Sequence, residues 1–323
     1  MATTQQTVAP VTAGAAPVRR RRWSAQQRAD AQFGFLLIAP AMLAIFAVAF
    51  LPLARTFWLS LWRINLRFAN TPRTFAGLDN FARILKDERF HNALWVTTRV
   101  AVVSLAAELI LGMIIALIIS RQFKARGLVR ASVLVPWALT TVVAARMWQL
   151  IYQADFGVFN RVLFDLYIID SYKPWVISPQ FTLWAMIGAD IWKTTPFVAL
   201  LLLAGLQLIP NDLYEAASID GASAWQGFWK ITLPLLRPTI LVASLFRLID
   251  VFRMFDLPLV LTGGGPGFAT ETLTLYTYRV LFQNLQFGLG SAVAVIAFLC
   301  VVLISFIFIK VLGAPAGRDA RGV

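Results

Sequence analysis

The stretch LGSAVAVIAFLCVVLISFIFIKVL, residues 289–312, contains a single charged residue, Lys310. A helix needs about 20 predominantly apolar residues to cross the hydrocarbon core of a bilayer. Buried strands of a soluble protein would instead be about 4 to 8 residues long and bounded by turn residues. Six long apolar stretches occur along the chain, and we expect each to be a membrane-spanning helix: 33–53, 93–120, 129–152, 181–205, 239–261 and 289–312.

The composition of the whole chain agrees with these spans. Of its 323 residues, 59% are hydrophobic and only 14% are charged, a balance that is unusual for a soluble domain. The predicted fold class is therefore an all-α membrane protein with six transmembrane helices. The chain has one cysteine, Cys300, and one histidine, His91, so the sequence excludes an intrachain disulfide and indicates no metal site and no cofactor.

The basic residues predict that both ends of the chain lie in the cytoplasm. Four arginines at 19–22 precede the first span, and short cytoplasmic loops of membrane proteins are enriched in lysine and arginine. The net charge of +13 is spread over several loops and not gathered in one basic domain, so we expect no nucleic-acid partner. We predict a disordered basic cytoplasmic tail at 1–30, a transmembrane domain at 31–313 and a cytoplasmic tail at 314–323.

The glycine-rich stretch TGGGPGFATET, residues 262–272, could be mistaken for a nucleotide site. A phosphate-binding loop requires a lysine directly after its last glycine, and Phe268 follows Gly267 here. We therefore predict a turn that ends the fifth span and begins an outer loop. Any ATP hydrolysis that drives this protein must take place on another chain.

A polar stretch, EAASIDGASAWQGFWKITLP at residues 215–234, separates the fourth and fifth spans. Asp212 is expected to cap a short helix together with Glu215, which stands three residues later as in a capping box. Gly221 should end this helix in the left-handed conformation, and Ser223 can cap a second helix that ends before the next proline. On physical grounds alone, a bilayer surface and a partner protein are equally good neighbours for such a pair of helices.

The spacing within this stretch resembles a known signature. Glu215, Ala216 and Ala217 are followed after three residues by Gly221, and after nine more by ITLP at 231–234. This arrangement is similar to E-A-A-x3-G-x9-I-x-L-P, the signature of the permeases of binding-protein-dependent ABC importers. Three further stretches resemble the carbohydrate branch, in particular the larger permease subunit of maltose and trehalose importers: 192–210, 246–266 and 286–292.

The resemblance implies a type I ABC importer permease whose cytoplasmic loop forms a coupling helix that docks on an ATPase. The residues implied in this contact are Glu215, Ala216, Ala217, Asp220 and Gly221, with Glu215 paired to a basic residue of the ATPase and Gly221 at the bend. The implied partners are a second permease subunit, two cytoplasmic ATPase subunits and an extracytoplasmic solute-binding protein or lipoprotein. The implied location is the inner or plasma membrane of a bacterial or archaeal cell, where lipid surrounds a multi-pass protein.

Ionisable residues inside the predicted spans are costly to bury and indicate either a polar pathway or pairing between helices. Counted from the glycine-rich turn and from Glu215, six residues on the fourth and fifth spans occupy positions that resemble the sugar contacts of the maltose permease. They form the predicted substrate pathway: Lys193, Thr194, Phe197, Arg247, Asp250 and Met254. The alternative is a ladder of ion pairs along the fifth span, with Asp190 and Lys193 as a second pair. Glu108, Arg99 and Arg146 are expected to be packing partners between helices.

Together these features predict the permease subunit of an ATP-driven importer, which receives a carbohydrate such as trehalose or maltose from a binding protein and performs no covalent chemistry. A glycerol-3-phosphate importer is the alternative, because the arginines would suit an anion. A membrane-embedded enzyme that uses Asp190, Asp250 or Glu108 is a weaker alternative, because no nucleophile or metal-ligand motif accompanies these carboxylates.

Overall fold

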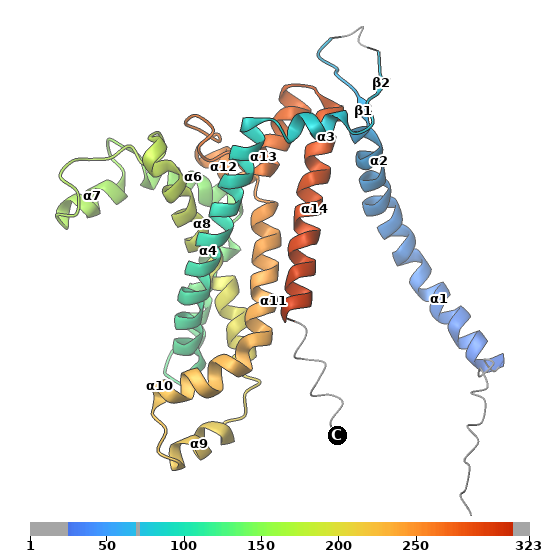
Figure 1. The fold of residues 1–323 in the computed structure, drawn as a ribbon. Coiled ribbons are helices and arrows are strands. Elements are labelled where there is room, and N and C mark those ends of the chain that lie inside the picture. The colour runs from blue at the N-terminus through green and yellow to red at the C-terminus, as the bar shows by residue number, and fades with distance from the viewer. Residues whose placement is uncertain (1–24, 69–71, 313–323) are drawn as a thin grey trace, which may run out of the picture. The chain divides into compact units, whose positions relative to one another are not determined.

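The computed structural model describes residues 25–68 and 72–312 and is predominantly helical (Figure 1). Its contacts divide the chain into two compact units, residues 1–54 and 55–323. The predicted tail residues 1–24 and 314–323 lie outside the described residues. Helix already begins at Ala25, inside the stretch for which we predicted a tail.

The first unit contains the first predicted span. Helix α1 (Ala25–Ile45) passes through a π-turn, η1 (Phe46–Phe50), into α2 (Leu51–Ser60), which continues past the boundary of the unit. Residues Gln32–Ser60 are long and apolar enough to cross a membrane, so the span extends beyond the predicted end at residue 53. Large apolar side chains such as Phe35 are exposed along it.

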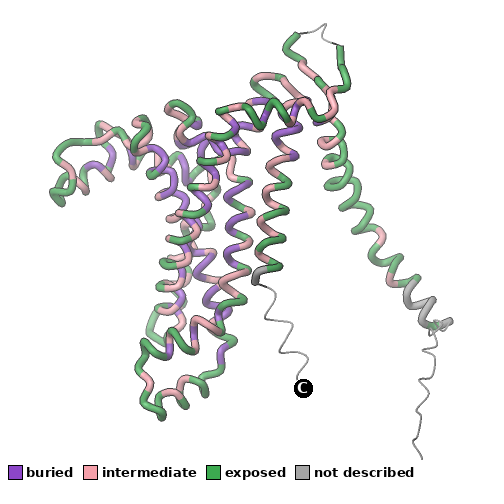
Figure 2. The backbone as a smooth tube through the Cα atoms, viewed as in Figure 1, coloured by how far each residue is buried: buried purple, intermediate pink, exposed green. Residues whose placement is uncertain are grey.

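The second unit is built around three long helices: α4 (Glu88–Ser120), α8 (Pro179–Leu206) and α11 (Leu233–Phe252). Helix α4 packs along α8, and α11 contacts both of them (Figure 1). Small residues permit close approach, since a Cβ on Gly112 of α4 would lie 3.0 Å from Cγ1 of Val198 on α8. Figure 2 shows buried residues along the facing surfaces of these helices. Helix α14 (Phe287–Leu312) packs against α11, and α4, α8 and α14 confirm three of the predicted spans.

The predicted third span, 129–152, is not one straight helix. It consists of α5 (Arg126–Ala138) and α6 (Thr141–Ile151), which are bent by 92° at the break between them. Pro136 lies in the last turn of α5, two residues before its end, and a proline removes a backbone donor from the helix. The chain then leaves the helical conformation at Leu139 and Thr140, both of which are extended.

The predicted fifth span, 239–261, has wrong bounds. Helix α11 begins at Leu233 and ends at Phe252, and a short separate helix, α12 (Asp256–Leu261), follows. The sequence pattern missed this break because the chain is mostly apolar on both sides of it, although Arg253 and Asp256 stand at the break itself. Helix α11 carries three charged residues, Arg237, Arg247 and Asp250, within its 20 residues. Within the described residues, four helices are long and apolar enough to cross a membrane, or five with the bent pair, and the count of six stays a prediction.

Shorter elements connect the long helices. The two-residue strands β1 (Trp62–Arg63) and β2 (Thr74–Phe75) pair antiparallel with Trp62 opposite Phe75. The remaining short helices and π-turns are α3 (Asp79–Ile84), α7 (Val158–Asp165), α9 (Asp212–Ile219), α10 (Ala224–Gly227), η2 (Phe228–Thr232), α13 (Leu273–Tyr278) and η3 (Arg279–Gln283).

Candidate functional site

A buried cluster of charges joins the three central helices. The guanidinium of Arg247 on α11 donates to both carboxylate oxygens of Glu108 on α4, at 2.5 and 2.8 Å. It also donates to Asp190 on α8 at 2.9 Å and to Asp250, one turn along α11, at 2.6 Å. The Arg247 side chain is only 2% exposed, and those of Glu108 and Asp190 are buried with it. Each central helix therefore contributes one buried charge to a single network.

The hydroxyl of Thr194 completes the network. Its Oγ1 lies 2.6 Å from Glu108 Oε1 and 2.7 Å from the backbone oxygen of Asp190. An ion that is buried without partners is very unfavourable, and pairing with additional hydrogen bonds is what makes such a site tolerable. The guanidinium of Arg247 pairs with three carboxylates, those of Glu108, Asp190 and Asp250. These carboxylates occupy the donor edges with which Arg247 would otherwise bind a ligand.

The residues of the predicted substrate pathway do not all lie in one environment. Arg247 and Thr194 are buried among other helices, whereas the Asp250 side chain is 68% exposed although it is held by Arg247. We predicted that Met254 shares a helical face with Arg247 and Asp250. This prediction is wrong, because Met254 lies beyond the end of α11. Its backbone oxygen instead accepts a hydrogen bond from Thr272 at 2.8 Å.

The two remaining predicted residues lie on α8. Lys193 is half-buried, and its side chain forms no ion pair or hydrogen bond with another described residue. Phe197 stacks on Trp137 of α5, with ring centroids 5.8 Å apart. The alternative prediction that Asp190 pairs with Lys193 is wrong, because Asp190 turns to Arg247.

The sequence predicts Glu108 only as a packing partner between helices. In the structure Glu108 does bridge α4 to α11, and it does so as the main partner of the buried Arg247. A single carboxylate in the middle of the most apolar part of α4 was the available signal. The two arginines grouped with it lie outside the cluster: Arg99 lies over the Trp95 ring and Arg146 donates to Gln149.

The loop with the signature spacing forms two helices, as predicted, with different details. Gly221 ends α9 with φ of +79°, and the amide of Ala222 donates to the backbone oxygen of Ala217 at 2.8 Å, which is the pattern of a glycine-terminated helix. Ser223 and Gln226 form a reciprocal capping box at the start of α10, which confirms the second cap. The first cap was placed wrongly, since Asn211 occupies the capping position and makes no side-chain cap.

The second helix of the loop does not end before Pro234. Helix α10 runs through the π-turn η2 directly into α11, where proline stands near the start. Pro234 has no backbone amide, and it directly follows the π-turn η2, where the regular hydrogen-bond pattern of an α-helix is already interrupted. The loop is therefore continuous with the helix that carries Arg247.

The surface residues of α9 divide into two faces. Glu215, Ala216, Asp220 and Gly221 are exposed, whereas Ala217 is half-buried and faces a groove within the chain. The hydroxyls of Tyr214 and Thr232 lie 2.9 Å apart and link α9 to η2. The outer face of α9 is thus free for a partner while its inner face is held against the rest of the loop.

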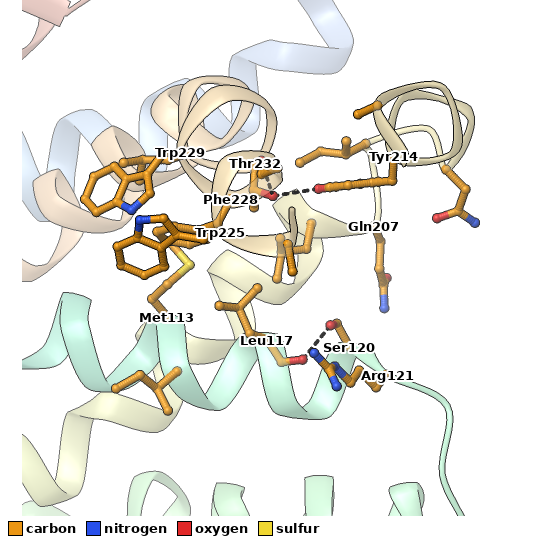
Figure 3. A pocket seen from close by; sticks show the side chains of 18 of the residues that line it. Met113, Leu117, Ser120, Arg121, Gln207, Tyr214, Trp225, Phe228, Trp229 and Thr232 are labelled. Carbon is orange, nitrogen blue, oxygen red and sulfur yellow. Dashed lines mark hydrogen bonds between the residues drawn. The ribbon is translucent and has the colours of Figure 1, made fainter. Parts of the chain in front are cut away.

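The groove itself has a volume of about 1470 Å³ and lies between the loop and the last turns of α4 (Figure 3). In Figure 3, Met113 lies beside Trp225 and Trp229 at one end, and Ser120 and Arg121 lie at the other. No sequence pattern predicted this groove, because it depends on how α9 and α10 fold back toward α4.

A second charged cluster fixes the glycine-rich stretch. Glu271 is fully buried and accepts two hydrogen bonds from Arg89 at 2.7 Å and one from Arg279 at 2.6 Å. Arg89 also lies 3.9 Å over the ring of Phe268, and Arg279 donates to the backbone oxygen of Gly263. The stretch is a turn, as predicted, and these contacts attach it to the start of α4.

Comparisons with known proteins match this architecture and its loop. The family described as "Binding-protein-dependent transport system inner membrane component" matches residues 108–314. The chain is 44% identical over 283 residues to the trehalose/maltose transport system permease protein MalF of Thermococcus litoralis, covering 87% of this chain and 94% of that protein. It is 42% identical over 296 residues to the trehalose transport system permease protein SugA of Mycobacterium tuberculosis (strain H37Rv), covering 91% and 93%.

The fold is also similar to that of a solved structure. A chain of the bacterial alginate ABC transporter in complex with alginate pentasaccharide-bound periplasmic protein matches with a TM-score of 0.74 and 20% identity. The match covers 92% of this chain and 98% of that one. At this identity the likeness concerns the fold, and it extends through nearly the whole chain.

Proposed function

The chain belongs to the family of binding-protein-dependent transport system inner membrane components, and on that premise we propose that it is the permease subunit of an ATP-driven importer of carbohydrates. It is a multi-pass membrane protein and a transport subunit with the fold of an ABC importer permease. The proposed substrate class is a disaccharide such as trehalose or maltose. The names of the relatives that are 44% and 42% identical support this choice.

The proposed subunit acts within a larger assembly. It pairs with a second permease subunit, receives sugar from an extracytoplasmic solute-binding protein or lipoprotein, and is driven by two cytoplasmic ATPase subunits. The sequence supports this division of labour, because its glycine-rich stretch lacks the lysine of a phosphate-binding loop. The family description supports the binding protein.

The exposed face of α9 is the proposed contact with the ATPase. Glu215 and Ala216 present a carboxylate and a small side chain outward, where a basic groove of a partner could receive them. Asp220 and Gly221 form the exposed end of the same helix, and Ala217 supports it from the inner side. Because α10 and η2 continue into α11, a displacement of this loop would be transmitted to the charged cluster around Arg247.

Six spans with both ends in the cytoplasm are the proposed topology. The bent pair α5–α6 and the helix α11 supply the two spans that are less regular than the other four. Helix α11 can cross the bilayer although it is charged, because its Arg247 is satisfied inside the bundle by Glu108 and Asp190.

The observation that carries the sugar pathway is the position of Asp250. Its carboxylate is 68% exposed, yet Arg247 holds one of its oxygens at 2.6 Å. A carboxylate that is fixed in direction and exposed is well suited to accept hydrogen bonds from sugar hydroxyls. Lys193 and Phe197 are proposed as a further donor and an aromatic surface, whereas Arg247 and Thr194 would hold the pathway in place without touching sugar, and Met254 would border it.

The charged cluster around Arg247 argues against the two alternative functions, a glycerol-3-phosphate importer and a membrane-embedded enzyme. A glycerol-3-phosphate site would need several free cationic donors. Arg247 is committed to three carboxylates, and of the predicted pathway residues only Lys193 is a cation without an ion pair. An enzyme would need Glu108, Asp190 or Asp250 to be free for proton transfer, and all three are held by Arg247.

The test is sugar-stimulated ATP hydrolysis by the complete importer in lipid nanodiscs. Binding protein loaded with trehalose or maltose should raise the rate, and binding protein offered glycerol 3-phosphate should not. Stimulation by glycerol 3-phosphate alone would overturn the proposed substrate class.

A further inference from the structure

The groove between α4 and the loop has an apolar part whose length is that of one bilayer leaflet. Its wall on α4 consists of residues at helical spacing: Leu109, Ile110, Met113, Ile114 and Leu117. At 1.5 Å per residue the eight steps from the first to the last cover about 12 Å, and half of a hydrocarbon core of about 30 Å is about 15 Å. Polar residues begin directly afterwards, at Ser120 and Arg121.

The apolar wall is not covered by other parts of the chain. Ile110 is 62% exposed and Trp225, on the opposite wall, is 70% exposed. Ile114 and Trp229 are also exposed. Aromatic residues of this kind are enriched where a protein meets the membrane interface. The occupant of this part of the groove must therefore be apolar itself.

The polar end carries positive charge without a counter-charge. Arg121 is exposed, and Arg126 uses only its Nε, which donates to the backbone oxygen of Ile119 at 3.0 Å. Gln207 and the hydroxyl of Tyr214 add polar groups at the groove. Among the described residues that line the groove there are two arginines and no carboxylate. The charge therefore favours an anionic group.

We propose that this groove binds one anionic phospholipid from the surrounding leaflet. Its acyl chains lie along the apolar wall of α4 beneath Trp225 and Trp229, and its phosphate accepts hydrogen bonds from Arg121 and Arg126. The volume of about 1470 Å³ exceeds the range of about 300 to 1,000 Å³ of typical small-molecule pockets, as a lipid requires. Basic pockets beside transmembrane helices are known to bind anionic headgroups.

The lipid would connect α4 to the inner side of the loop. Ala217 and Ser218 of α9 line the groove from within, while Glu215 and Ala216 remain exposed on the outer face. A lipid and a protein on the outer face can therefore be bound together. This site depends on the groove alone and does not rest on the proposed substrate or on the ATPase contact.

The experiment measures lipid retention by the full-length chain, purified within its importer complex from nanodiscs of phosphatidylcholine with a minority of phosphatidylglycerol. Native mass spectrometry should detect about one retained phosphatidylglycerol per chain. The double substitution Arg121→Ala/Arg126→Ala should weaken retention about 30-fold, since each basic residue near an anionic surface contributes about 1 kcal/mol. Arg237→Ala, an exposed arginine on α11 outside the groove, is the matched control and should retain lipid like the unaltered chain.

A second variant tests the apolar part of the site. Ile114→Trp places a larger side chain on the wall of the groove and should reduce retention without removing a charge. Absence of retained phosphatidylglycerol in the unaltered complex would overturn the proposal, and so would equal retention by all variants. Displacement of the lipid by inorganic phosphate would show a free-anion site, and retention by the permease subunits alone but not by the complete importer would show that the ATPase occupies the groove. Either result would also overturn it.

Discussion

Glu108 on α4 accepts two hydrogen bonds from Arg247 on α11, at 2.5 and 2.8 Å, although the two residues are 139 positions apart in the sequence. Asp190 on α8 joins the same guanidinium. The interior of the membrane domain is thus held together by one cation that three helices share. The cluster fixes the direction of Asp250, whose carboxylate remains exposed beside it.

Loss of Arg247 should destabilise the domain strongly. Arg247→Met would leave Glu108 and Asp190 buried without their cation, and removal of one partner of a buried ion pair costs about 3 to 5 kcal/mol. The apparent unfolding temperature of the purified chain in nanodiscs should therefore fall clearly. Arg253→Met, an exposed arginine directly after α11, is the control and should change it little. Equal unfolding temperatures for both variants would contradict the structural role of the cluster.

Loss of Asp250 should affect transport more than stability. An ion pair with an exposed partner contributes about 0 to 1 kcal/mol, so Asp250→Ala should assemble normally. A hydrogen bond to a charged group is worth about 1.5 to 3 kcal/mol, so sugar uptake should fall about tenfold or more. Uptake of labelled trehalose into proteoliposomes measures this effect, with Asp256→Ala, an exposed carboxylate on α12, as control. Failure of Asp250→Ala to assemble would show that the residue serves the ion pair alone.

Substitution by alanine should destabilise the loop at Gly221 and stabilise it at Gly227. A Cβ meets no atom within 4 Å at either residue, but Gly221 has φ of +79° and Gly227 is helical. The left-handed conformation costs a residue with a Cβ about 1 to 2 kcal/mol, whereas alanine in a helix is favoured over glycine by about 1 kcal/mol.

Hydrogen exchange of the α9 amides should accordingly become about tenfold faster in Gly221→Ala. In Gly227→Ala, exchange around α10 should become slower or stay the same. Identical exchange in the two variants would show that the bend at Gly221 does not hold the loop in shape.

The cluster around Glu271 should stabilise the glycine-rich turn. Glu271→Gln removes the buried charge that Arg89 and Arg279 share, and we expect a loss of about 3 kcal/mol and faster proteolysis of the turn. Asp79→Asn is the matched control, because its ion pair with Arg63 is exposed on both sides and should contribute at most about 1 kcal/mol. A turn that resists protease equally in both variants would contradict this role.

Much of this architecture follows from local sequence, and the rest depends on contacts between distant residues. Long apolar runs predicted α4, α8 and α14, and the local chemistry of Gly221 and Ser223 predicted how the loop bends. The break between α11 and α12 was missed because the chain is mostly apolar on both sides of Arg253 and Asp256. The 92° bend before α6 was missed because apolar residues surround it.

The candidate site shows the same limit. The sequence identifies Arg247 and Asp250 as charged residues within one predicted span. Their helical spacing predicts ion pairs between residues of that same helix. The observed partner Glu108 lies on another helix, and no periodicity within α11 could have identified it. The lipid-sized groove likewise arises only when α9 and α10 fold back toward α4.

The central claim is that ATP hydrolysis on a partner drives sugar through this chain by way of Glu215. The most direct measurement is binding-protein-dependent uptake of labelled trehalose by proteoliposomes that contain the complete importer, with ATP inside. Glu215→Lys should insert and assemble but lose uptake and sugar-stimulated ATP hydrolysis, while Asp165→Lys, the same reversal of charge at an exposed residue of α7, should leave both intact. Normal coupled uptake by Glu215→Lys, or uptake by the unaltered chain without ATP, would contradict the account.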